Sequence, residues 1–508
     1  MSRSTGGVGD RVLAIDLGTS MVKAGVFGRD GQRFGFGAAR PTSHSPQPGW
    51  SEQPSGPLWS ATVHACRQAV GESGPQEIEA VSITGARGSI ALDDGDCGLL
   101  TDFITWQDRR STDHAESAAA LVDAGAYYRT TGGRMDASLW LPKLLWLAEF
   151  RTELVSRAGR VITPPTFVAQ QFGADHPPTE WSAAAYSGLF DIASYTWHEE
   201  LVRKFGVPSE WLPPLAEPGT AVGVVSAMAA ELTGISQGAA LVLAAADGPC
   251  ADLGCGVVDP GALTCYLGTA ISVAGPLPQR IEDDTQSLLI APGATRGNYR
   301  MLALGLAGAS VLDWYRAVTS YQVLDGLDAL VEQSSVGSRG VLFVPALAGA
   351  GAPLWSPHAR GAFLGLEFGH TKADLVRAML EGVAFECSSM IDALGPFGFA
   401  RTGVRIAGGG SRSRAWTQMI ADLLDAPVIV PNEPDPGLRG AAAYALVHCG
   451  FFADVIAAAG ALEGPATVRE PTMPATGALQ ARADTYRLVR QTFLNSGLDE
   501  ALAKVVEP

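Results

Sequence analysis

The chain has 508 residues, of which 47% are hydrophobic and 17% are charged, so it can bury a sizeable core and is not a disordered chain. Its 36 basic and 52 acidic residues give a formal charge of −16, which would repel nucleic acid and anionic lipid. An anionic cofactor is still allowed, because backbone amides and Mg²⁺ bind phosphate locally whatever the net charge.

The first structured segment predicts an antiparallel meander of three strands. Residues 12–17 and 21–27 are rich in apolar side chains and flank a glycine-containing turn, and residues 32–38 can form a third strand. Apolar residues then recur at helical spacing over 57–70, and 78–84 returns to a strand. A meander followed by alternating helices and strands indicates an α/β fold rather than a sandwich.

A second unit of the same kind begins near residue 240. The apolar runs 239–246 and 262–267 each end in a turn. The tripeptide Leu-Gly-Thr starts at Leu17 and again at Leu267, and in both places it closes one strand and precedes another. This shared context makes an internal structural duplication plausible.

The two units are expected to form two domains. No low-complexity linker separates them, so a broad interface with a cleft is the expected arrangement. The expected bounds are 1–245 for the N-terminal domain and 246–508 for the C-terminal domain. The last helix of the chain could pack back on the N-terminal domain.

The cysteines and the N-terminus favour an intracellular protein. Seven cysteines without a C-x-x-C pair argue against a disulfide framework, so reduced and mostly buried thiols are expected. The first residues hold no apolar signal segment, and no apolar run reaches the length needed to cross a bilayer. The expected location is therefore the cytoplasm, without a membrane partner.

The turn after the first strand carries a candidate phosphate site, formed by Asp16, Gly18, Thr19, Ser20 and Lys23. A glycine turn with neighbouring hydroxyls lets backbone N–H groups approach phosphate oxygens, and a carboxylate at a strand end can hold hydrated Mg²⁺. An ordinary hairpin turn explains the same residues, and this motif alone does not exclude it.

A run of three glycines forms a second candidate. Gly408, Gly409 and Gly410 link the apolar strand 404–407 to the start of a helix, an arrangement that brings helix N–H groups close to a nucleotide. A crowded turn between a strand and a helix would need the same glycines.

Two further positions carry side chains suited to a hydroxyl substrate. Asp247 ends an apolar run and could accept a hydroxyl proton during phosphoryl transfer, or it could cap a helix that starts with Pro249. Trp106, Asp108 and Arg109 could bind a sugar, or they could belong to a solvated loop with the tryptophan in the core. The eight histidines show no metal-ligand spacing, so no zinc site is expected.

Two longer segments are more specific than any single motif. Residues 361–366 and 374–381 resemble one signature of a known kinase family, and 143–149 resembles another, although Trp140 stands where a small residue or proline is usual. With the motifs above in this order, the sequence resembles the FGGY family of carbohydrate kinases over nearly its whole length.

The resemblance implies two RNase H-like domains of the actin and hexokinase type, with ATP and Mg²⁺ in a catalytic cleft between them. It implies that Asp247 is the general base and that Asp16 positions Mg²⁺. The sugar-binding residues that it implies are Arg87, Trp106, Asp108 and Asp247. The phosphate- and ATP-binding residues that it implies are Gly18, Thr19, Ser20, Lys23, Gly268, Thr269, Gly408, Gly409 and Gly410.

The resemblance extends to several substrate classes. Residues 373–385 and 416–422 are most similar to xylulokinases, but Gly88 stands where those kinases usually carry a histidine. Arg87 and residues 106–109 resemble glycerol kinases, although Gly248 stands where those kinases carry a glutamine, and Asp247 followed by Gly248 resembles gluconokinases. The expected reaction is phosphorylation of D-xylulose to D-xylulose 5-phosphate, with a glycerol or polyol kinase and a gluconokinase as alternatives.

Two other functional classes share this fold. Actin-like and chaperone ATPases use nucleotide to drive a conformational change without phosphorylating a sugar. A catalytically silent sugar-binding relative is a further alternative, against which the intact phosphate loops speak. The expected partners are a small sugar and ATP, with no nucleic acid, and a homodimer is left open.

Overall fold

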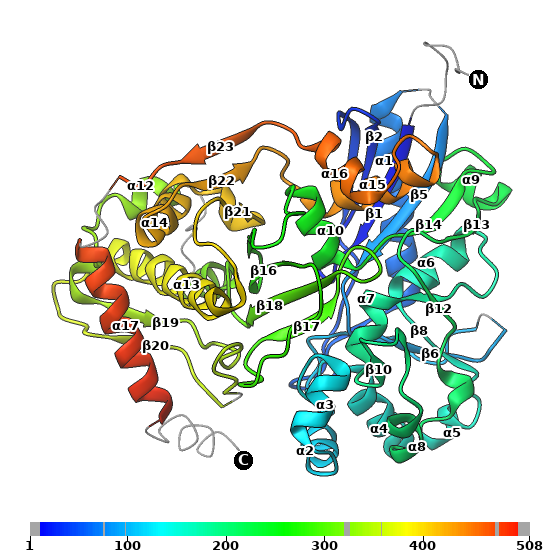
Figure 1. Cartoon of the computed structure of the whole chain (residues 1–508), viewed down its shortest axis with the longest axis horizontal. Coiled ribbons are helices and arrows are strands. Elements are labelled where there is room, and N and C mark those ends of the chain that lie inside the picture. Colours follow the sequence, from blue (N-terminus) through cyan, green and yellow to red (C-terminus); the bar gives the residue numbers. More distant parts are fainter. Residues whose placement is uncertain are drawn as a thin grey trace.

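The computed structural model describes residues 11–74, 77–96, 98–319, 326–356, 358–472 and 477–495. The chain forms two sheet-containing halves that lie side by side, the first on the right of Figure 1 and the second on the left. Each half contains one large mixed β-sheet with helices packed against it, which confirms the predicted α/β class.

The first sheet has six strands, which in spatial order are β13 (Ala221–Val224), β14 (Ala240–Leu243), β5 (Ile78–Gly85), β1 (Arg11–Leu17), β2 (Val22–Gly28) and β3 (Arg33–Ala39). β1, β2 and β3 form the predicted meander, in which Leu17 pairs with Val22 across the first turn. β1, β5 and β14 run parallel, so their carboxyl ends meet at one edge of the sheet.

The second sheet has seven strands, which in spatial order are β17 (Leu289–Pro292), β18 (Tyr299–Gly305), β16 (Ile271–Leu277), β15 (Thr264–Leu267), β21 (Val404–Ala407), β22 (Val428–Pro431) and β23 (Ala466–Arg469). β15 and β16 form an antiparallel hairpin in which Leu267 pairs with Ile271, and β15, β21 and β22 run parallel. A hairpin beside parallel strands repeats the plan of the first sheet, so the predicted duplication is confirmed.

Helices from both halves of the chain cover the first sheet. One face packs against α1 (Ser55–Ser73), α6 (Pro164–Phe172) and α9 (Ala227–Thr233). The other face packs against α10 (Asp247–Gly254), α15 (Pro436–His448) and α16 (Val455–Leu462). The C-terminal part of the chain therefore completes the core of the N-terminal domain.

The helix that crosses back is not the last one. α17 (Ala478–Asn495) packs against α13 (Lys372–Leu394) and α14 (Arg414–Leu424) of the second half, as Figure 1 shows on the left. The buried Tyr486 of α17 lies beside Phe385 of α13. The expectation for the last helix is thus corrected: the small and apolar side chains of α15 fit the first sheet, whereas α17 has its own apolar partner.

α10 and α15 approach each other unusually closely. A β-carbon added to Gly440 of α15 would lie 1.8 Å from the carbonyl oxygen of Cys250 in α10. A β-carbon added to Gly254 of α10 would lie 1.8 Å from the carbonyl oxygen of Pro436 in α15. Only glycine fits at both contacts, so the two helices pack backbone to backbone.

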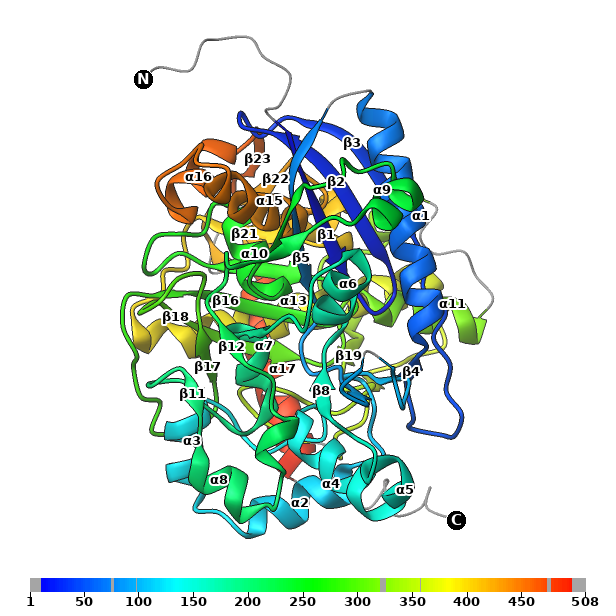
Figure 2. The same cartoon turned by 90° about the vertical axis from the view of Figure 1, so that its right-hand side faces the viewer.

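A helical lobe is inserted between β5 and β14, at the lower right of Figure 1 and at the bottom of Figure 2. Its helices are α2 (Thr112–Ala120), α3 (Ala124–Thr131), α4 (Trp140–Phe150), α5 (Thr152–Val155), α7 (Trp181–Ala184) and α8 (Glu199–Lys204). Its core is a separate apolar cluster that includes Trp140, Leu144 and Trp211. Two short strands, β4 (Glu52–Gln53) and β7 (Phe103–Ile104), pair between this lobe and the first sheet.

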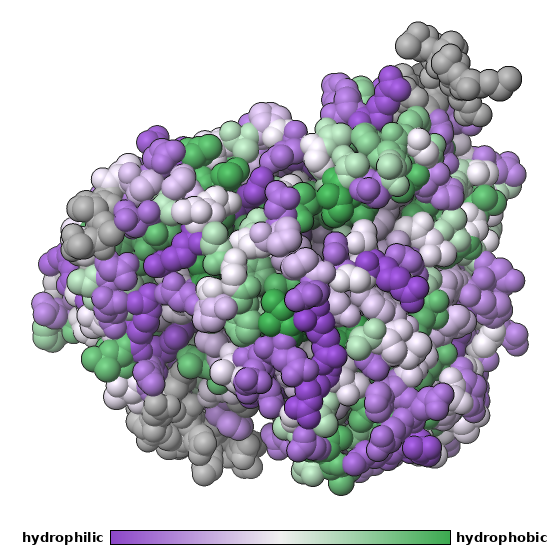
Figure 3. All heavy atoms as spheres, viewed as in Figure 1, coloured by the Kyte–Doolittle hydropathy of each residue, from purple (hydrophilic) through white to green (hydrophobic). Residues whose placement is uncertain are grey.

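The surface in Figure 3 mixes hydrophilic and hydrophobic residues and has no broad hydrophobic area on this face. Within the described ranges, no helix has the length and apolar character needed to span a bilayer. The described cysteines are free, and all are buried except Cys449, which is partly exposed. This agrees with the prediction of reduced, mostly buried thiols, and Cys97 lies outside the described residues.

Candidate active site

The parallel strands of the first sheet bring three predicted site residues to one edge. Asp16 lies at the end of β1, Arg87 follows β5, and Asp247 follows β14 as the first residue of α10. The Nε atom of Arg87 lies 3.9 Å from Oδ1 of Asp247. Ligands of open α/β sheets bind at the carboxyl ends of the strands, so this edge is the candidate active site.

Asp247 remains accessible at this edge. Its side chain is 46% exposed, and Oδ1 accepts a hydrogen bond from the N–H of Gly248 at 2.7 Å. The peptide bond between Ala245 and Ala246 is held on both sides. Its N–H donates a hydrogen bond to the hydroxyl of Ser182, and its carbonyl oxygen accepts one from the hydroxyl of Thr84. The strand end therefore holds Asp247 in place while leaving Oδ2 open to a substrate hydroxyl.

Asp16 lies in a cluster of charged groups. It pairs across the hairpin with Lys23, whose Nζ atom forms an ion pair with Asp435 at 2.6 Å. Burial raises the pKa of Asp16 to about 7, the carboxylates of Asp247 and Asp435 add to the rise, and Lys23 opposes it. A partly buried carboxylate that faces two other carboxylates and one lysine would be stabilised by further positive charge, which a divalent cation could supply.

The first glycine turn, at Gly18 to Ser20, is hydrogen-bonded to the loop that carries Trp106, where sugar binding was predicted. The indole N–H of Trp106 donates to the hydroxyl of Thr19 at 3.0 Å, and the side-chain amide of Gln53 donates to the carbonyl of Thr19 at 3.4 Å. Ser20 is exposed, and a β-carbon at Gly18 would lie 2.7 Å from the carbonyl of Met21. The pairing of β4 with β7 thus delivers two side chains to this turn.

The second glycine turn lies in the other half of the molecule and is held by the start of α11 (Ser310–Thr319). The carbonyl of Thr269 accepts hydrogen bonds from the N–H of Gly308 and the hydroxyl of Ser310, at 2.8 and 2.7 Å. The carbonyl of Gly268 accepts from the N–H of Ala309. The side chain of Thr269 is exposed, so its hydroxyl is free to face a ligand.

The three-glycine run lies directly beside the second turn, because β15 and β21 are neighbours. A β-carbon at Gly408 would lie 2.7 Å from the carbonyl oxygen of Leu267, whereas one at Gly409 would meet no atom within 4 Å. α14 begins after this run, with Ser413 as its N-cap. Gly409 is exposed between two buried glycines, and its open backbone next to a glycine turn fits the phosphates and base of a nucleotide.

The guanidinium of Arg87 has spare hydrogen-bonding capacity. It lies 4.2 Å above the ring of Tyr186, its side chain is 10% exposed, and Nη1 is buried without a hydrogen-bond partner among the described residues. A buried N–H without an acceptor costs free energy, which a substrate oxygen would recover. The guanidinium of Arg300 lies next to Gly248, since a β-carbon added there would lie 3.1 Å from it, but Arg300 already forms an ion pair with Asp252.

Asp108 does not fit its predicted role. It is fully buried, and its two oxygens accept hydrogen bonds from the side chain and N–H of Arg110 and from the N–H of Ser51. The carboxylate therefore has no oxygen left for a sugar, and it serves to anchor the loop that carries Trp106. The prediction that Asp108 contacts the substrate is corrected by these contacts.

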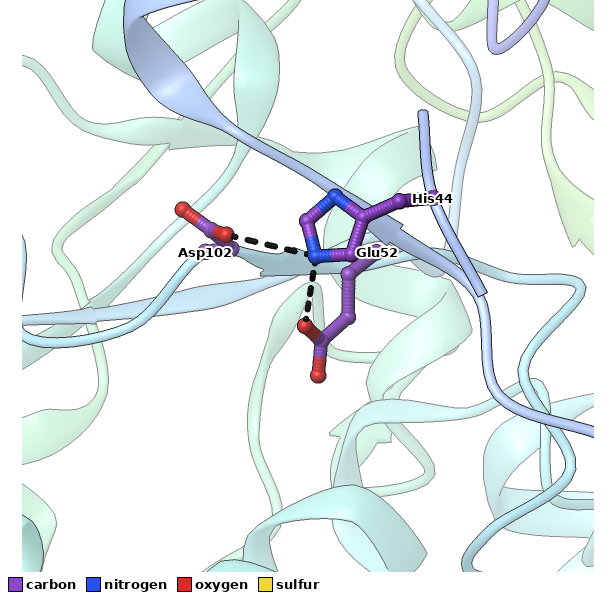
Figure 4. Close-up of side chains that lie close together, drawn as sticks. All are labelled: His44, Glu52 and Asp102. Atoms are coloured by element: carbon purple, nitrogen blue, oxygen red, sulfur yellow. Dashed lines mark ion pairs between the residues drawn. The ribbon is translucent and has the colours of Figure 1, made fainter. Parts of the chain in front are cut away.

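A second group of potential ligands lies near β4, away from Asp16. Figure 4 shows the His44 ring between Glu52 and Asp102, with Nε2 at 3.2 Å and 3.9 Å from their carboxylates. Among the described residues, these three side chains form one group close enough to hold a metal. Arg110 already neutralises Glu52 at 2.7 Å, so we read the group as an ion-pair network.

Asp435 and Tyr186 lie in the site but were not anticipated from the sequence. Asp435 precedes Pro436, the first residue of α15, and this pattern is typical of a helix start. It could have identified Asp435 as the residue before a helix, though not as a member of the site. Nothing in the local sequence singles out Tyr186, because its contact with Arg87 joins residues far apart in the chain.

Comparison with known proteins identifies relatives over most of the chain. The N-terminal domain of the FGGY family of carbohydrate kinases matches residues 11–254, and its C-terminal domain matches 264–449. A glycerol kinase of Dechloromonas aromatica is 31% identical, over 87% of this chain and 90% of its own. A xylulose kinase of Bacillus subtilis is 27% identical, over 87% of this chain and 89% of its own. A gluconokinase of the same organism is 27% identical, over 86% and 88%.

Solved structures match the fold over nearly the whole chain. A gluconate kinase from Lactobacillus acidophilus superposes with a TM-score of 0.86 at 24% identity, over 96% of this chain and 99% of its own. A xylulose kinase from Brucella ovis superposes with a TM-score of 0.79 at 26% identity, over 97% and 100%. The predicted two-domain fold of the sugar kinases and actin-like ATPases is thereby confirmed.

Proposed function

Since the chain belongs to the FGGY family of carbohydrate kinases, we propose that it transfers the γ-phosphoryl group of ATP to a terminal hydroxyl of a small sugar. The observation that carries this proposal is the accessible Asp247 beside Arg87, at the strand edge that also holds the first glycine turn. ADP and a sugar phosphate are the products.

Asp247 is the proposed general base. The sugar hydroxyl attacks phosphorus, the bond to the ADP oxygen breaks, and the hydroxyl proton moves to Asp247 as the new P–O bond forms. The guanidinium of Arg87, beside Asp247, would donate hydrogen bonds to another oxygen of the same sugar and so orient its terminal hydroxyl. The partly exposed Trp106 offers an apolar surface for the C–H face of the sugar.

The proposed ATP site spans both halves of the molecule. Gly18, Thr19 and Ser20 approach the phosphates from the first half, and the second glycine turn approaches them from the other half. The run that ends at Gly410 would accept the adenosine side. Asp16 would hold Mg²⁺, which neutralises phosphate charge when bound. Lys23 lies beside Asp16 and would add positive charge to the same region.

D-Xylulose is the first candidate substrate. The sequence similarity of residues 373–385 to xylulokinases supports it, and a xylulose kinase is among the relatives at 27% identity. Asp108 no longer contributes to this choice, because its oxygens are occupied. Glycerol remains an alternative, since a glycerol kinase is 31% identical.

A sugar acid is the second candidate, and a specific observation favours it. The guanidinium of Arg87 would pair more strongly with a carboxylate than with a hydroxyl, because both partners are then charged. The match to a gluconokinase at 27% identity is consistent with this candidate.

A comparison of substrates tests the proposal. We would measure sugar-dependent ADP release and compare kcat/KM for D-xylulose, L-ribulose, glycerol and gluconate. We expect D-xylulose to have the highest value. A tenfold advantage for glycerol or gluconate, about 1.4 kcal/mol in transition-state binding, would reject xylulose but not the kinase. ATP hydrolysis that no sugar or polyol accelerates would reject the kinase function itself.

A further inference from the structure

A fully buried lysine lies directly behind the proposed sugar site. Lys143 extends from α4, and its Nζ atom donates hydrogen bonds to the carbonyl oxygens of Gly88 and Ser138, each at 2.7 Å. Gly88 follows Arg87 in the turn after β5, and Ser138 lies in the segment before α4. One amine therefore joins two backbone segments of the substrate side.

The turn at Gly88 has little freedom of its own. Its φ is +79°, and a β-carbon there would lie 2.6 Å from the carbonyl oxygen of Ser138 and 3.1 Å from Cβ of Trp106. The next residue, Ser89, accepts a hydrogen bond from the backbone N–H of Trp106 at 3.2 Å. The carbonyl held by Lys143 thus belongs to Gly88, which lies between Arg87 and Ser89, the residue that is hydrogen-bonded to Trp106.

We infer that Lys143 is a positioning residue of the sugar site: its buried amine clamps the carbonyls of Gly88 and Ser138 and so aims the Arg87 guanidinium at the substrate beside Asp247. The inference rests on the proposed function, because it takes the space beside Asp247 as the sugar site. Lys143 touches neither substrate nor reacting atoms, and it acts on turnover only through the backbone that it holds.

The surroundings of the amine favour its neutral form. Burial lowers the pKa of Lys143 from 10.5 to about 7, Asp108 and Asp136 oppose this change, and Arg109 and Arg110 add to it. The two carboxylates are already paired, Asp108 with Arg110 and Asp136 with Arg109. A neutral amine has two N–H donors, and two carbonyls accept them, so the geometry is satisfied without the charge.

Steady-state kinetics separate positioning from a merely structural role. Lys143→Met keeps an unbranched side chain that is one atom shorter and removes both donors, so we expect the KM for the sugar to rise about tenfold. The KM for ATP should stay within about twofold of the parent value. Leu147→Ala, on the same helix and equally buried, is the control: it should lower the melting temperature and leave the sugar KM unchanged. An unchanged sugar KM in Lys143→Met, or an equal rise in Leu147→Ala, would overturn the inference.

Lys143→Gln is the second variant, for the case that the methionine variant fails to fold. Its amide can donate but is one bond shorter, so it reaches one carbonyl and the sugar KM should still rise. A sugar KM equal to that of the parent would overturn the inference here too.

A stability measurement tests the buried amine without any substrate. Folding lowers the pKa of Lys143, so the unfolded chain binds more protons than the folded protein between pH 7 and 10.5. The contribution of Lys143 to stability therefore rises with pH in this window. The melting temperature of the parent minus that of Lys143→Met should increase from pH 7 to 9.5. A flat difference contradicts the buried amine, whereas a parent protein inactive on every sugar contradicts the proposed function.

Discussion

At the scale of single residues, some side chains of the site already have hydrogen-bond or ion-pair partners within the protein, and others can still form a hydrogen bond to a ligand. Asp108 and Arg300 have their partners within the protein. Asp247 is partly exposed, and Nη1 of Arg87 is buried without a partner among the described residues. A substrate with several oxygens would satisfy both at once, which is why these two residues carry the proposed chemistry.

Replacing Asp247 by asparagine should preserve the shape of the site and remove the proton acceptor. Because general-base catalysis contributes roughly 10²–10⁴-fold, we expect kcat to fall by about that factor while the KM for ATP changes little. Steady-state kinetics and nucleotide titration would measure both. Near-normal kcat in Asp247→Asn would exclude this residue as the general base.

Replacing Asp16 by alanine should weaken the response to Mg²⁺. The partly buried carboxylate of Asp16 is the proposed metal ligand, so its loss should lower activity in a way that excess Mg²⁺ restores only in part. A Mg²⁺ titration of activity compares the variant with the parent protein. Identical half-saturating Mg²⁺ concentrations would show that Asp16 does not position the metal.

At the scale of secondary-structure elements, the close pair of helices α10 and α15 fixes the distance between two charged residues. α10 begins with Asp247, and α15 follows Asp435, the partner of Lys23. The two helices touch through Gly254 and Gly440, where each faces a backbone carbonyl of the other. A change in the spacing of the helices therefore moves Asp247, the proposed general base, relative to Asp435 and its partner Lys23.

Gly440→Ala should push the two helices apart. Its β-carbon would fall 1.8 Å from a carbonyl oxygen, so we expect a loss of about 1–3 kcal/mol in the free energy of unfolding, together with a lower kcat. Gly460→Ala on α16 is the matched control, since no atom lies within 4 Å of its added β-carbon. That variant should be neutral or more stable by about 0.5–1 kcal/mol. Urea unfolding measures both, and equal stabilities would contradict the close packing.

Sequence patterns predicted the strands, turns and hairpins whose formation depends on residues close together in the chain. Apolar runs ending in glycine turns located both hairpins, and the position of Asp247 at a strand end followed from the same pattern. The burial of Asp108 could not be predicted, because Arg110 is as compatible with a solvated loop as with a buried pair. The crossing of α15 to the first sheet depends on contacts between distant residues, which no short pattern records.

At the scale of the whole molecule, the proposed ATP site is divided between the two halves. The turn at Thr19 belongs to the first sheet and the turn at Thr269 to the second, and each is secured by contacts within its own half. Neither half alone can surround the phosphates. Binding of ATP and sugar should therefore draw the halves together and exclude water, which would otherwise compete as the acceptor.

Small-angle scattering can detect this closure. A folded chain of 508 residues has an expected radius of gyration of about 23 Å, and we expect a smaller value with a non-hydrolysable nucleotide and sugar together. Each ligand alone serves as the control and should produce a smaller change. An unchanged radius with both ligands at saturation would count against closure.

The return of α15 and α16 to the first sheet also sets an order for biosynthesis. When residues 1–245 leave the ribosome, the sheet face that holds Val12, Ala14 and Val242 still lacks its covering helices: α10 follows at once, but α15 and α16 begin about 190 and 210 residues further along the chain. The part of that apolar face covered by α15 and α16 stays open until the end of translation is near. In the nascent chain this apolar surface has to be kept from contact with other chains until α15 and α16 are made. A fragment that ends at residue 245 should therefore aggregate where the complete chain does not.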